Sequence, residues 1–178
     1  MSDRYTPAAL TPPLVAREAP GLPWSVSTGD LPDINVWLAL AVQEHPHHAA
    51  ARAYWAQVQA GGTALWFCRV TMLGLVRLLC QPRVVGDGAL APAAAWAAYQ
   101  RFRAVRSVGL LAEPPGCDLQ LHALVAQAPL PARQWTDAYL ASLALAAGLR
   151  LVTFDQDFHR FALDRVLVLN GGGNKQHP

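Results

Sequence analysis

Short apolar runs alternate with helix-like segments along most of this chain of 178 residues, and this alternation constrains the fold more than any other feature. The strongest strand patterns lie at residues 63–70, 150–154 and 166–169. Strands that are apolar on both faces and separated by helices form parallel sheets that are covered on both sides. We therefore expect an α/β fold in which helices predominate.

The same pattern predicts where the remaining elements lie. Shorter strands are expected at residues 31–34 and 108–112. Helices are expected at residues 36–42, 48–59, 72–80, 92–106, 117–127 and 137–147. Thr71 and Thr136 stand where the N-caps of two of these helices would lie, and Gly148 marks a helix end.

Both ends of the chain differ from this body. Residues 1–30 contain five prolines and no periodic apolar stripe, which predicts a Pro-rich N-terminal extension, either disordered or the product of a misassigned start codon. Residues 170–178 are glycine-rich and polar, which predicts a flexible C-terminal tail. The part between them, residues 31–169, has the length of one domain.

Composition narrows the protein class. A hydrophobic fraction of 53% with 15% charged residues is globular, and the net charge of +2 does not by itself indicate a polyanion partner. No apolar run approaches the roughly 18 residues of a membrane span, and residues 1–24 lack the apolar core of a secretory signal. Three cysteines without CxxC spacing predict buried thiols rather than disulfides or a zinc site. We expect a cytoplasmic protein without membrane contact.

Carboxylates stand at the expected strand ends. Asp33 and Asp155 each follow a strand, and Asp137 opens the helix that precedes the strand at 150–154. Ligands bind outside the carboxyl ends of parallel strands, so we expect these three groups to converge there. Clustered carboxylates repel one another unless a cation is bound, and their oxygens suit Mg²⁺ or Mn²⁺. The pattern indicates metal-dependent phosphodiester hydrolysis, although each Asp alone also fits a turn or a helix-dipole contact.

Four segments, in order, are similar to the sequence blocks of PIN-domain ribonucleases, specifically VapC-type toxins of type II toxin–antitoxin systems. The first contains Leu31-Pro32-Asp33-Ile34-Asn35 and continues to Arg52; the others are residues 71–79, 135–141 and 151–155. This resemblance covers residues 31–169. It implies a three-layer α/β/α sandwich with a short parallel sheet, and an acidic pocket that holds Mg²⁺, or Mn²⁺ in its place.

The resemblance also implies activity, partners and residue roles. Members of the family cleave single-stranded stretches of RNA, often tRNA or rRNA, and are silenced by a cognate antitoxin; a homodimer is expected. The implied catalytic and metal-binding residues are Asp33, Asp137 and Asp155, with Asp157 as a further metal ligand. The residues implied to bind substrate or support these carboxylates are Asn35, Thr71, Arg77 and Thr136. An ion pair with an Asp is an equal alternative for Arg77.

One departure from the family pattern concerns Gly74. Many PIN domains carry a Glu three residues after the Thr of the second block, where this chain has Gly74. The difference puts a second metal position in doubt and motivates an alternative, a catalytically impaired PIN-like module that binds RNA or protein. A phosphatase with Asp33 as nucleophile is a weaker alternative, because Asn35 replaces the usual second Asp and Lys175 lies in the tail.

Two other polar groups have simpler interpretations. The histidines of residues 45–48 surround Pro46 at a helix start, and we expect a solvated helix entrance there rather than a transition-metal site. A local basic patch on the helix at 92–106 is expected to be a solvated face, with contact to an RNA backbone as the alternative. Its members are Arg101, Arg103 and Arg106.

Overall fold

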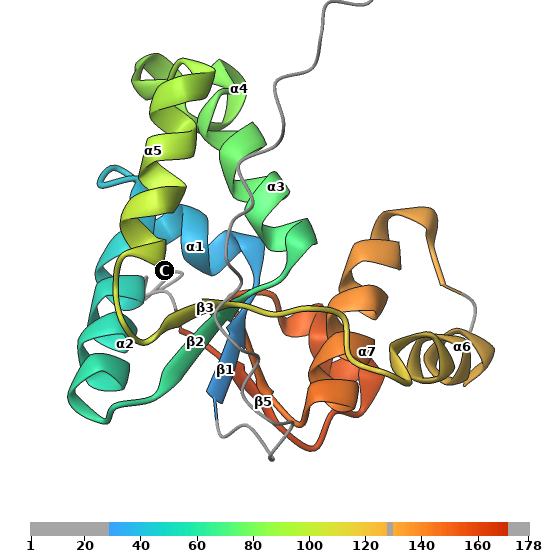
Figure 1. Cartoon of the computed structure of the whole chain (residues 1–178). Helices are drawn as coiled ribbons and strands as arrows, with labels where there is room; N and C mark the ends of the chain where they lie inside the picture. Colours follow the sequence, from blue (N-terminus) through green and yellow to red (C-terminus); the bar gives the residue numbers. More distant parts are fainter. Residues whose placement is uncertain (1–28, 128–129, 171–178) are drawn as a thin grey trace, which may run out of the picture.

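The computed structural model describes residues 29–127 and 130–170, and its strands form one parallel sheet in the order β3-β2-β1-β4-β5 (Figure 1). The strands are β1 (Gly29–Pro32), β2 (Ala64–Phe67), β3 (Val108–Leu110), β4 (Arg150–Thr153) and β5 (Val166–Val168). Every neighbouring pair in the sheet is parallel. The predicted α/β class is confirmed.

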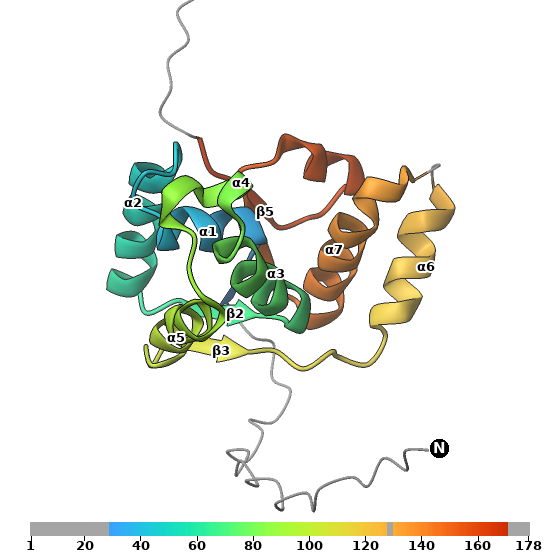
Figure 2. The same ribbon diagram turned by 90° about the horizontal axis from the view of Figure 1, so that it is seen from above.

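Helices cover both faces of the sheet (Figures 1 and 2). One face carries α1 (Ile34–Ala41), α2 (His48–Ala60), α3 (Arg69–Leu79) and α5 (Pro92–Arg103). The other face carries α6 (Cys117–Gln127) and α7 (Trp135–Ala147). Short helical turns complete the fold: α4 (Pro82–Val85), η1 (Gly86–Gly88), η2 (Ala132–Gln134) and η3 (Gln156–Phe161). This is the expected three-layer α/β/α sandwich.

Successive side chains along each short strand point to opposite faces of the sheet, so the core is divided into two clusters. Phe67 of β2 points toward α1, where its ring stacks on that of Trp37 at 3.7 Å between ring centroids. Trp66, its neighbour in β2, packs with the cluster beneath α6 and α7. In the same way Val152 and Leu151 of β4 serve opposite faces. A strand such as β2 or β4 thus needs apolar residues that face both sides of the sheet, which is why these strands appear as apolar runs in the sequence.

Several predicted boundaries are wrong by a few residues. Helix α3 begins at Arg69 with Cys68 as its N-cap, so Thr71 lies inside the first turn rather than at the cap. Helix α7 begins at Trp135, so Thr136 is also not a cap. In contrast, the predicted helix end at Gly148 is confirmed, because this residue is in the left-handed region with φ of 66°.

Strand β1 begins at Gly29, two residues before the expected start of the body. Asp30, which we assigned to the extension, is buried in this strand and accepts hydrogen bonds from the Arg150 guanidinium at 2.7 and 2.8 Å. The Tyr54 hydroxyl donates to the same carboxylate at 2.7 Å. The predicted extension before residue 29 and the tail from residue 171 lie outside the described residues.

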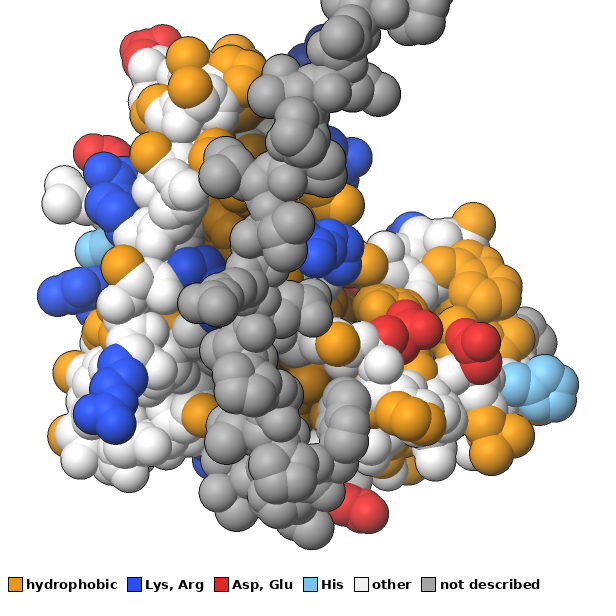
Figure 3. All heavy atoms as spheres, viewed as in Figure 1, with side chains coloured by type: hydrophobic (Ala, Val, Ile, Leu, Met, Phe, Trp, Pro, Cys, Tyr) orange, Lys and Arg blue, Asp and Glu red, His pale blue; other side chains and the backbone are white. Residues whose placement is uncertain are grey.

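Charge is unevenly distributed over the surface. Figure 3 shows basic side chains over α2 and α5 and acidic side chains over the α6–α7 side. Arg52 of α2, Arg101 of α5 and Arg106, in the turn after α5, are exposed. The guanidinium of Arg103 instead donates to the carbonyl oxygen of Val108. No helix within the described residues is long and apolar enough to span a membrane.

Candidate active site

Asp33 lies directly after β1 and is the N-cap of α1. Its backbone N–H donates to the carbonyl of Val152 at 2.8 Å, which fixes the residue against the end of β4. One carboxylate oxygen, Oδ1, accepts from the backbone N–H of Ile34 at 2.6 Å. The other, Oδ2, accepts from the hydroxyl of Thr153 at 3.0 Å. The side chain is therefore held rigidly where β1 and β4 end, at the sheet edge where the sequence predicted it.

Thr153 connects the polar groups around this point. Its buried hydroxyl donates to Asp33 and accepts from Asn35 Nδ2 and from the backbone N–H of Asp155, both at 3.0 Å. The amide oxygen of Asn35 in turn accepts from the backbone N–H of Phe154 at 3.3 Å. Sequence reasoning placed Thr153 in a strand and missed this role, because no spacing rule links residues 120 apart in the chain.

Burial dominates the protonation of Asp33. Burial is the largest cause of a raised pKa for this carboxyl, the negative charges of Asp137 and Asp155 add to it, and the resulting pKa is about 6. The hydrogen bonds from Ile34 and Thr153 act in the opposite direction. Asp33 thus carries an unneutralised charge in the metal-free protein whenever the pH exceeds this value.

Asp137, in the first turn of α7, belongs to the same electrostatic group. Burial raises its pKa first, followed by the charges of Asp155 and Asp157, while Arg133 and Arg160 lower it. Figure 2 shows α1 and α7 on opposite sides of the sheet. The fold therefore brings Asp33, Asp137 and Asp155 within electrostatic range of one another, as the strand-end argument predicts.

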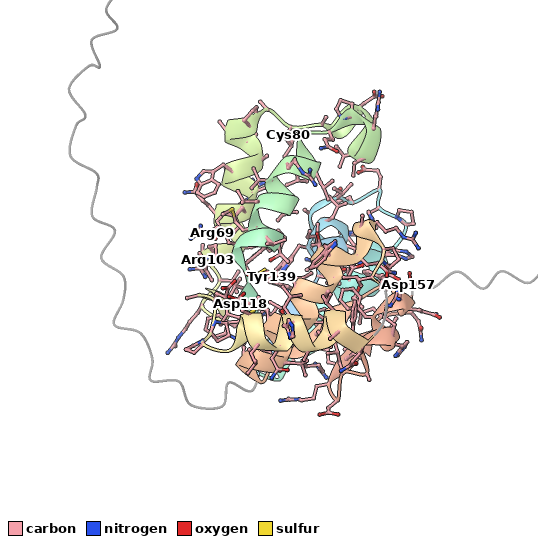
Figure 4. The ribbon with its side chains drawn as sticks, turned by 90° about the vertical axis from the view of Figure 1, so that its right-hand side faces the viewer. Arg69, Cys80, Arg103, Asp118, Tyr139 and Asp157 are labelled. Atoms are coloured by element: carbon pink, nitrogen blue, oxygen red, sulfur yellow. The ribbon has the colours of Figure 1, made fainter. Side chains whose placement is uncertain are left out.

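Asp155 and Asp157 follow β4 in an exposed turn. Asp155 caps η3 by accepting from the backbone N–H of Asp157 at 2.8 Å, so this side chain also has a local structural role. In Figure 4 Asp157 lies across the molecule from Asp118, Arg69 and Arg103. Asp157 is thus well separated from Arg103 of α5.

Gln134 is a buried site residue that the sequence analysis missed. Its side-chain N–H donates to Asp157 Oδ2 at 3.3 Å, and its amide oxygen accepts from the Arg160 guanidinium. A neutral amide thus lies between the acid and the arginine, and Arg160 forms no carboxylate ion pair among the described residues. Nothing in the sequence around a glutamine that precedes a helix indicates that it will form hydrogen bonds with both Asp157 and Arg160.

Three of the predicted supporting residues form no hydrogen bond or ion pair with the carboxylates within the described residues. Thr71 is completely buried, and its hydroxyl exchanges hydrogen bonds with the backbone of Cys68 at 3.0 and 3.1 Å, which leaves it no access to substrate. Thr136 is exposed and has no hydrogen bond to the site. Arg77 is exposed on the last turn of α3 and, within residues 29–127 and 130–170, pairs with no carboxylate.

Gly74 explains why an acid is absent from the second block. A Cβ added there would lie 2.6 Å from Ile34 Cδ1 and 3.0 Å from Ile34 Cγ1. Helices α1 and α3 thus approach each other closely at this pair, one residue after Asp33. A glutamate at position 74 would require Ile34 to move. An acid at this position would therefore need α1 and α3 to pack differently from the way they do here.

The predicted helix start is confirmed, because α2 begins at His48, but the histidines of residues 45–48 are less solvated than we expected. His45, His47 and His48 are each partly buried. The ring of His47 stacks on Phe154 with 4.5 Å between ring centroids and an interplanar angle of 15°. His48 Nδ1 lies 2.7 Å from the carbonyl oxygen of Ala39. This turn is therefore packed against the residue that lies between Thr153 and Asp155.

Carboxylate oxygens are suitable ligands for a hard divalent cation, although the carboxylates do not form a complete metal site in this structure. Oxygen ligands of this kind select Mg²⁺ or Mn²⁺ over zinc. Burial is the first cause that raises the pKa values of Asp33 and Asp137, and neighbouring carboxylates raise them as well, a repulsion that a cation would relieve. In the described part of the chain, no three His, Cys, Asp or Glu side chains are placed closely enough to hold an ion together.

Comparison with known proteins identifies the family. The model of the PIN domain matches residues 31–163. The chain belongs to the PIN-domain family. Its VapC-type character follows from Mycobacterium tuberculosis ribonuclease VapC41, which is 43% identical over 134 residues, covering 72% of this chain and 90% of the relative. Ribonuclease VapC44 of the same species is 34% identical over 151 residues, covering 82% and 94%.

Solved structures of PIN-domain proteins support the same fold. VapBC2 from Rickettsia felis, bound to a promoter DNA fragment, matches with a TM-score of 0.61 at 12% identity, over 79% of this chain and 98% of that one. Mycobacterium tuberculosis VapC20, described as a toxin that cleaves the sarcin–ricin loop, matches with a TM-score of 0.56 at 16% identity, over 80% and 100%. At these identities the likeness establishes the PIN fold alone.

Proposed function

We propose that this PIN-domain protein is a VapC-type toxin, a metal-dependent endoribonuclease that cleaves RNA phosphodiester bonds. The observation that carries the proposal is that Asp33 is buried and lies close enough to Asp137 and Asp155 for their charges to raise its pKa further. Such mutually repelling carboxylates are typical of a cation site. Relatives named ribonucleases support the assignment.

The proposed cation is Mg²⁺, with Mn²⁺ as its substitute, held by Asp33, Asp137 and Asp155 and, as a further ligand, Asp157. When bound, such an ion lowers the pKa of a coordinated water and stabilises negative charge on a phosphate. Thr153 and Asn35 hold Asp33 and the β4 end in register through the hydrogen bonds already described. Their role is positioning, since neither is placed to accept a proton from water.

Arg160 and Arg133 are the basic groups that act on the acidic cluster, because both lower the pKa of Asp137. We assign them to the incoming RNA phosphate. The amide oxygen of Gln134 accepts a hydrogen bond from Arg160. Because this partner is neutral, the positive charge of the guanidinium is not neutralised and can attract a phosphate. Arg77, which pairs with no carboxylate among the described residues, remains a second candidate for phosphate contact.

The proposed partners are an RNA substrate of the tRNA or rRNA class, a cognate antitoxin and a second copy of the chain. An antitoxin is supported by the VapBC2 structure, whose name denotes a toxin with its antitoxin. The homodimer follows from the family resemblance. We further propose that the protein acts in the cytoplasm, where such RNAs are found.

A second candidate function is a non-catalytic RNA- or protein-binding module, favoured by the missing acid at Gly74. The close contact between position 74 and Ile34 shows that no acidic side chain fits there without a rearrangement. Cleavage that depends on Asp33 would exclude this alternative, whereas RNA binding without cleavage would support it.

The test is cleavage of total tRNA and rRNA by the full-length chain with Mg²⁺ or Mn²⁺. We expect Asp33→Asn and Asp137→Asn each to reduce the rate at least about 100-fold, since each removes a ligand charge from the cation. The matched control is Asp118→Asn, an exposed Asp of α6 that lies across the molecule from Asp157 (Figure 4). Equal activity in the three variants and the wild type would refute the nuclease assignment.

A further inference from the structure

Three aromatic rings, which we call the stack, contact one another in a row that starts at the acidic site; the inner pair is stacked and the outer pair is tilted. Phe154 follows Thr153 and precedes Asp155, and its ring stacks on His47 with centroids 4.5 Å apart. His47 is followed by His45, with centroids 5.6 Å apart and an interplanar angle of 52°. His47 thus lies between the other two rings, and His45 is the outer end of the stack, on the turn between α1 and α2.

This stack is fixed relative to the site. The backbone N–H of Phe154 donates to Asn35, whose side-chain N–H donates to the same Thr153 hydroxyl that holds Asp33. At the outer end, the backbone N–H of His47 donates to His45 Nδ1 at 3.2 Å. The rings therefore keep a constant position with respect to the carboxylates, as a substrate contact requires.

The imidazoles of this turn form no ion pair and belong to no metal site among the described residues. Within the described residues no histidine pairs with a carboxylate, and no three candidate ligands could hold a metal ion. His45 Nδ1 accepts a hydrogen bond, which requires an unprotonated nitrogen, and burial together with the neighbouring His47 and His48 lowers the pKa of this ring. His47 Nδ1 is buried without a partner.

A neutral ring offers a substrate its π-face rather than a charge. The turn at residues 42–47 contains no Arg or Lys, and Glu44 would repel a phosphate. It therefore cannot hold the RNA backbone electrostatically. Unpaired bases, in contrast, stack on Phe, Tyr, Trp and His side chains, which is the usual way in which proteins bind single-stranded RNA.

We propose that the stack of Phe154, His47 and His45 is a platform for one unpaired base of the RNA substrate, beside the phosphate that is cleaved. This inference rests on the proposed function and adds to it a specific contact. His45 is the ring that meets the base, and His47 and Phe154 support it from below. The platform selects single-stranded over paired RNA, because a base within a duplex has no free face.

The test measures affinity for a short unstructured RNA by fluorescence anisotropy, with the full-length chain in EDTA so that no cleavage occurs. We expect His45→Ala to weaken binding about tenfold, the size of one lost stacking contact, and His45→Phe to bind within about twofold of wild type. In cleavage assays with Mg²⁺, His45→Ala should raise KM and leave kcat nearly unchanged. The matched control, His122→Ala on the exposed face of α6, should change neither value.

An abasic RNA series distinguishes base stacking from any other role of the ring. One abasic position should weaken wild-type binding as much as His45→Ala does, and the same position should have no further effect in the variant. Equal losses for His45→Phe and His45→Ala, or additive effects of variant and abasic position, would overturn the platform. If wild type cleaves RNA but His45→Ala binds normally, this inference falls and the nuclease stands. If Asp33→Asn cleaves as well as wild type, the nuclease assignment itself falls.

Discussion

The Thr153 hydroxyl donates to Asp33 across two neighbouring strands, with 3.0 Å between Oγ1 and Oδ2. The same oxygen accepts from Asn35 and from the backbone of Asp155. One buried side chain therefore sets the relative positions of the β1 end, the first turn of α1 and the turn after β4. The sheet thus determines where Asp33 and Asp155 lie, while the Thr153 hydroxyl orients the Asp33 carboxylate and holds the backbone of Asp155.

Replacing Thr153 with Val should damage both stability and activity. The two side chains have the same shape, so the change removes the hydroxyl and leaves the part-buried Asn35 N–H and the Asp155 N–H without their acceptor. We expect the free energy of unfolding to fall by about 2 kcal/mol, the cost of such unsatisfied groups, and cleavage to fall at least about tenfold. Urea denaturation and RNA cleavage measure the two effects.

Thr153→Ser is the matched control, because it keeps the hydroxyl and loses one methyl group. It should retain most of the activity at a cost of about 1 kcal/mol in stability. If Thr153→Val matches Thr153→Ser in both assays, the hydroxyl does not organise the site.

The raised pKa of Asp33 predicts that the metal-free protein loses stability as the pH rises. The native carboxyl titrates at about 6 against an ordinary value of 3.8, so between these pH values the native state binds more protons than the unfolded state. Stability then falls with increasing pH, by about 3 kcal/mol in total for this group. The loss is complete above about pH 7.

Asp33→Asn isolates this contribution. At about pH 4 the variant should be less stable than wild type by about 1 kcal/mol, because one amide oxygen replaces two acceptors. At about pH 7.5 it should be more stable by about 2 kcal/mol, since the buried charge is gone. Thermal unfolding in EDTA across this range checks the change of sign. A difference that stays constant with pH would mean that Asp33 titrates normally.

Asp33 and Asp155 could be predicted because the strand-end rule requires only local patterns, namely two apolar runs each followed by an acid. The carboxylates of Asp30 and Asp33 show the limit of that reasoning. Both belong to the same short segment, yet one lies in the site and the other is paired with Arg150. Which partner each meets depends on side chains up to 120 residues away, and neither spacing nor composition encodes that register.

The buried pair of Asp30 and Arg150 predicts that residues just before the matched family segment are needed for folding. Asp30→Asn should lower the free energy of unfolding by about 2 kcal/mol, less than the loss for a wholly buried pair, because the Arg150 side chain is 37% exposed. Tyr54→Phe removes one hydrogen bond to the same carboxylate and should cost about 1 kcal/mol.

Guanidinium chloride unfolding of both variants and of the double variant measures the coupling between them. Arg52→Ala, an exposed arginine of α2, is the control and should change stability by less than about 0.5 kcal/mol. Strictly additive effects of Asp30→Asn and Tyr54→Phe would show that the hydroxyl and the carboxylate do not interact in solution.

The close contact between Gly74 and Ile34 allows a direct test of whether packing accounts for the absence of an acidic residue at position 74. Gly74→Ala places a Cβ 2.6 Å from Ile34 Cδ1, so the Ile34 side chain must move. The expected cost of overpacking, about 2 kcal/mol, exceeds the gain of about 1 kcal/mol from replacing a helical glycine. We therefore expect a net loss of about 1 kcal/mol in urea unfolding.

Ile34→Val removes the Cδ1 atom that causes the clash and should itself cost about 1 kcal/mol. In this background Gly74→Ala should become neutral or stabilising, because the methyl group then fills the space that Cδ1 vacated. The double variant would thus be more stable than the sum of the single changes predicts, by about 1 kcal/mol or more. Additive effects would mean that α1 and α3 already adjust freely, and in that case packing against Ile34 would not account for the absence of an acid at position 74.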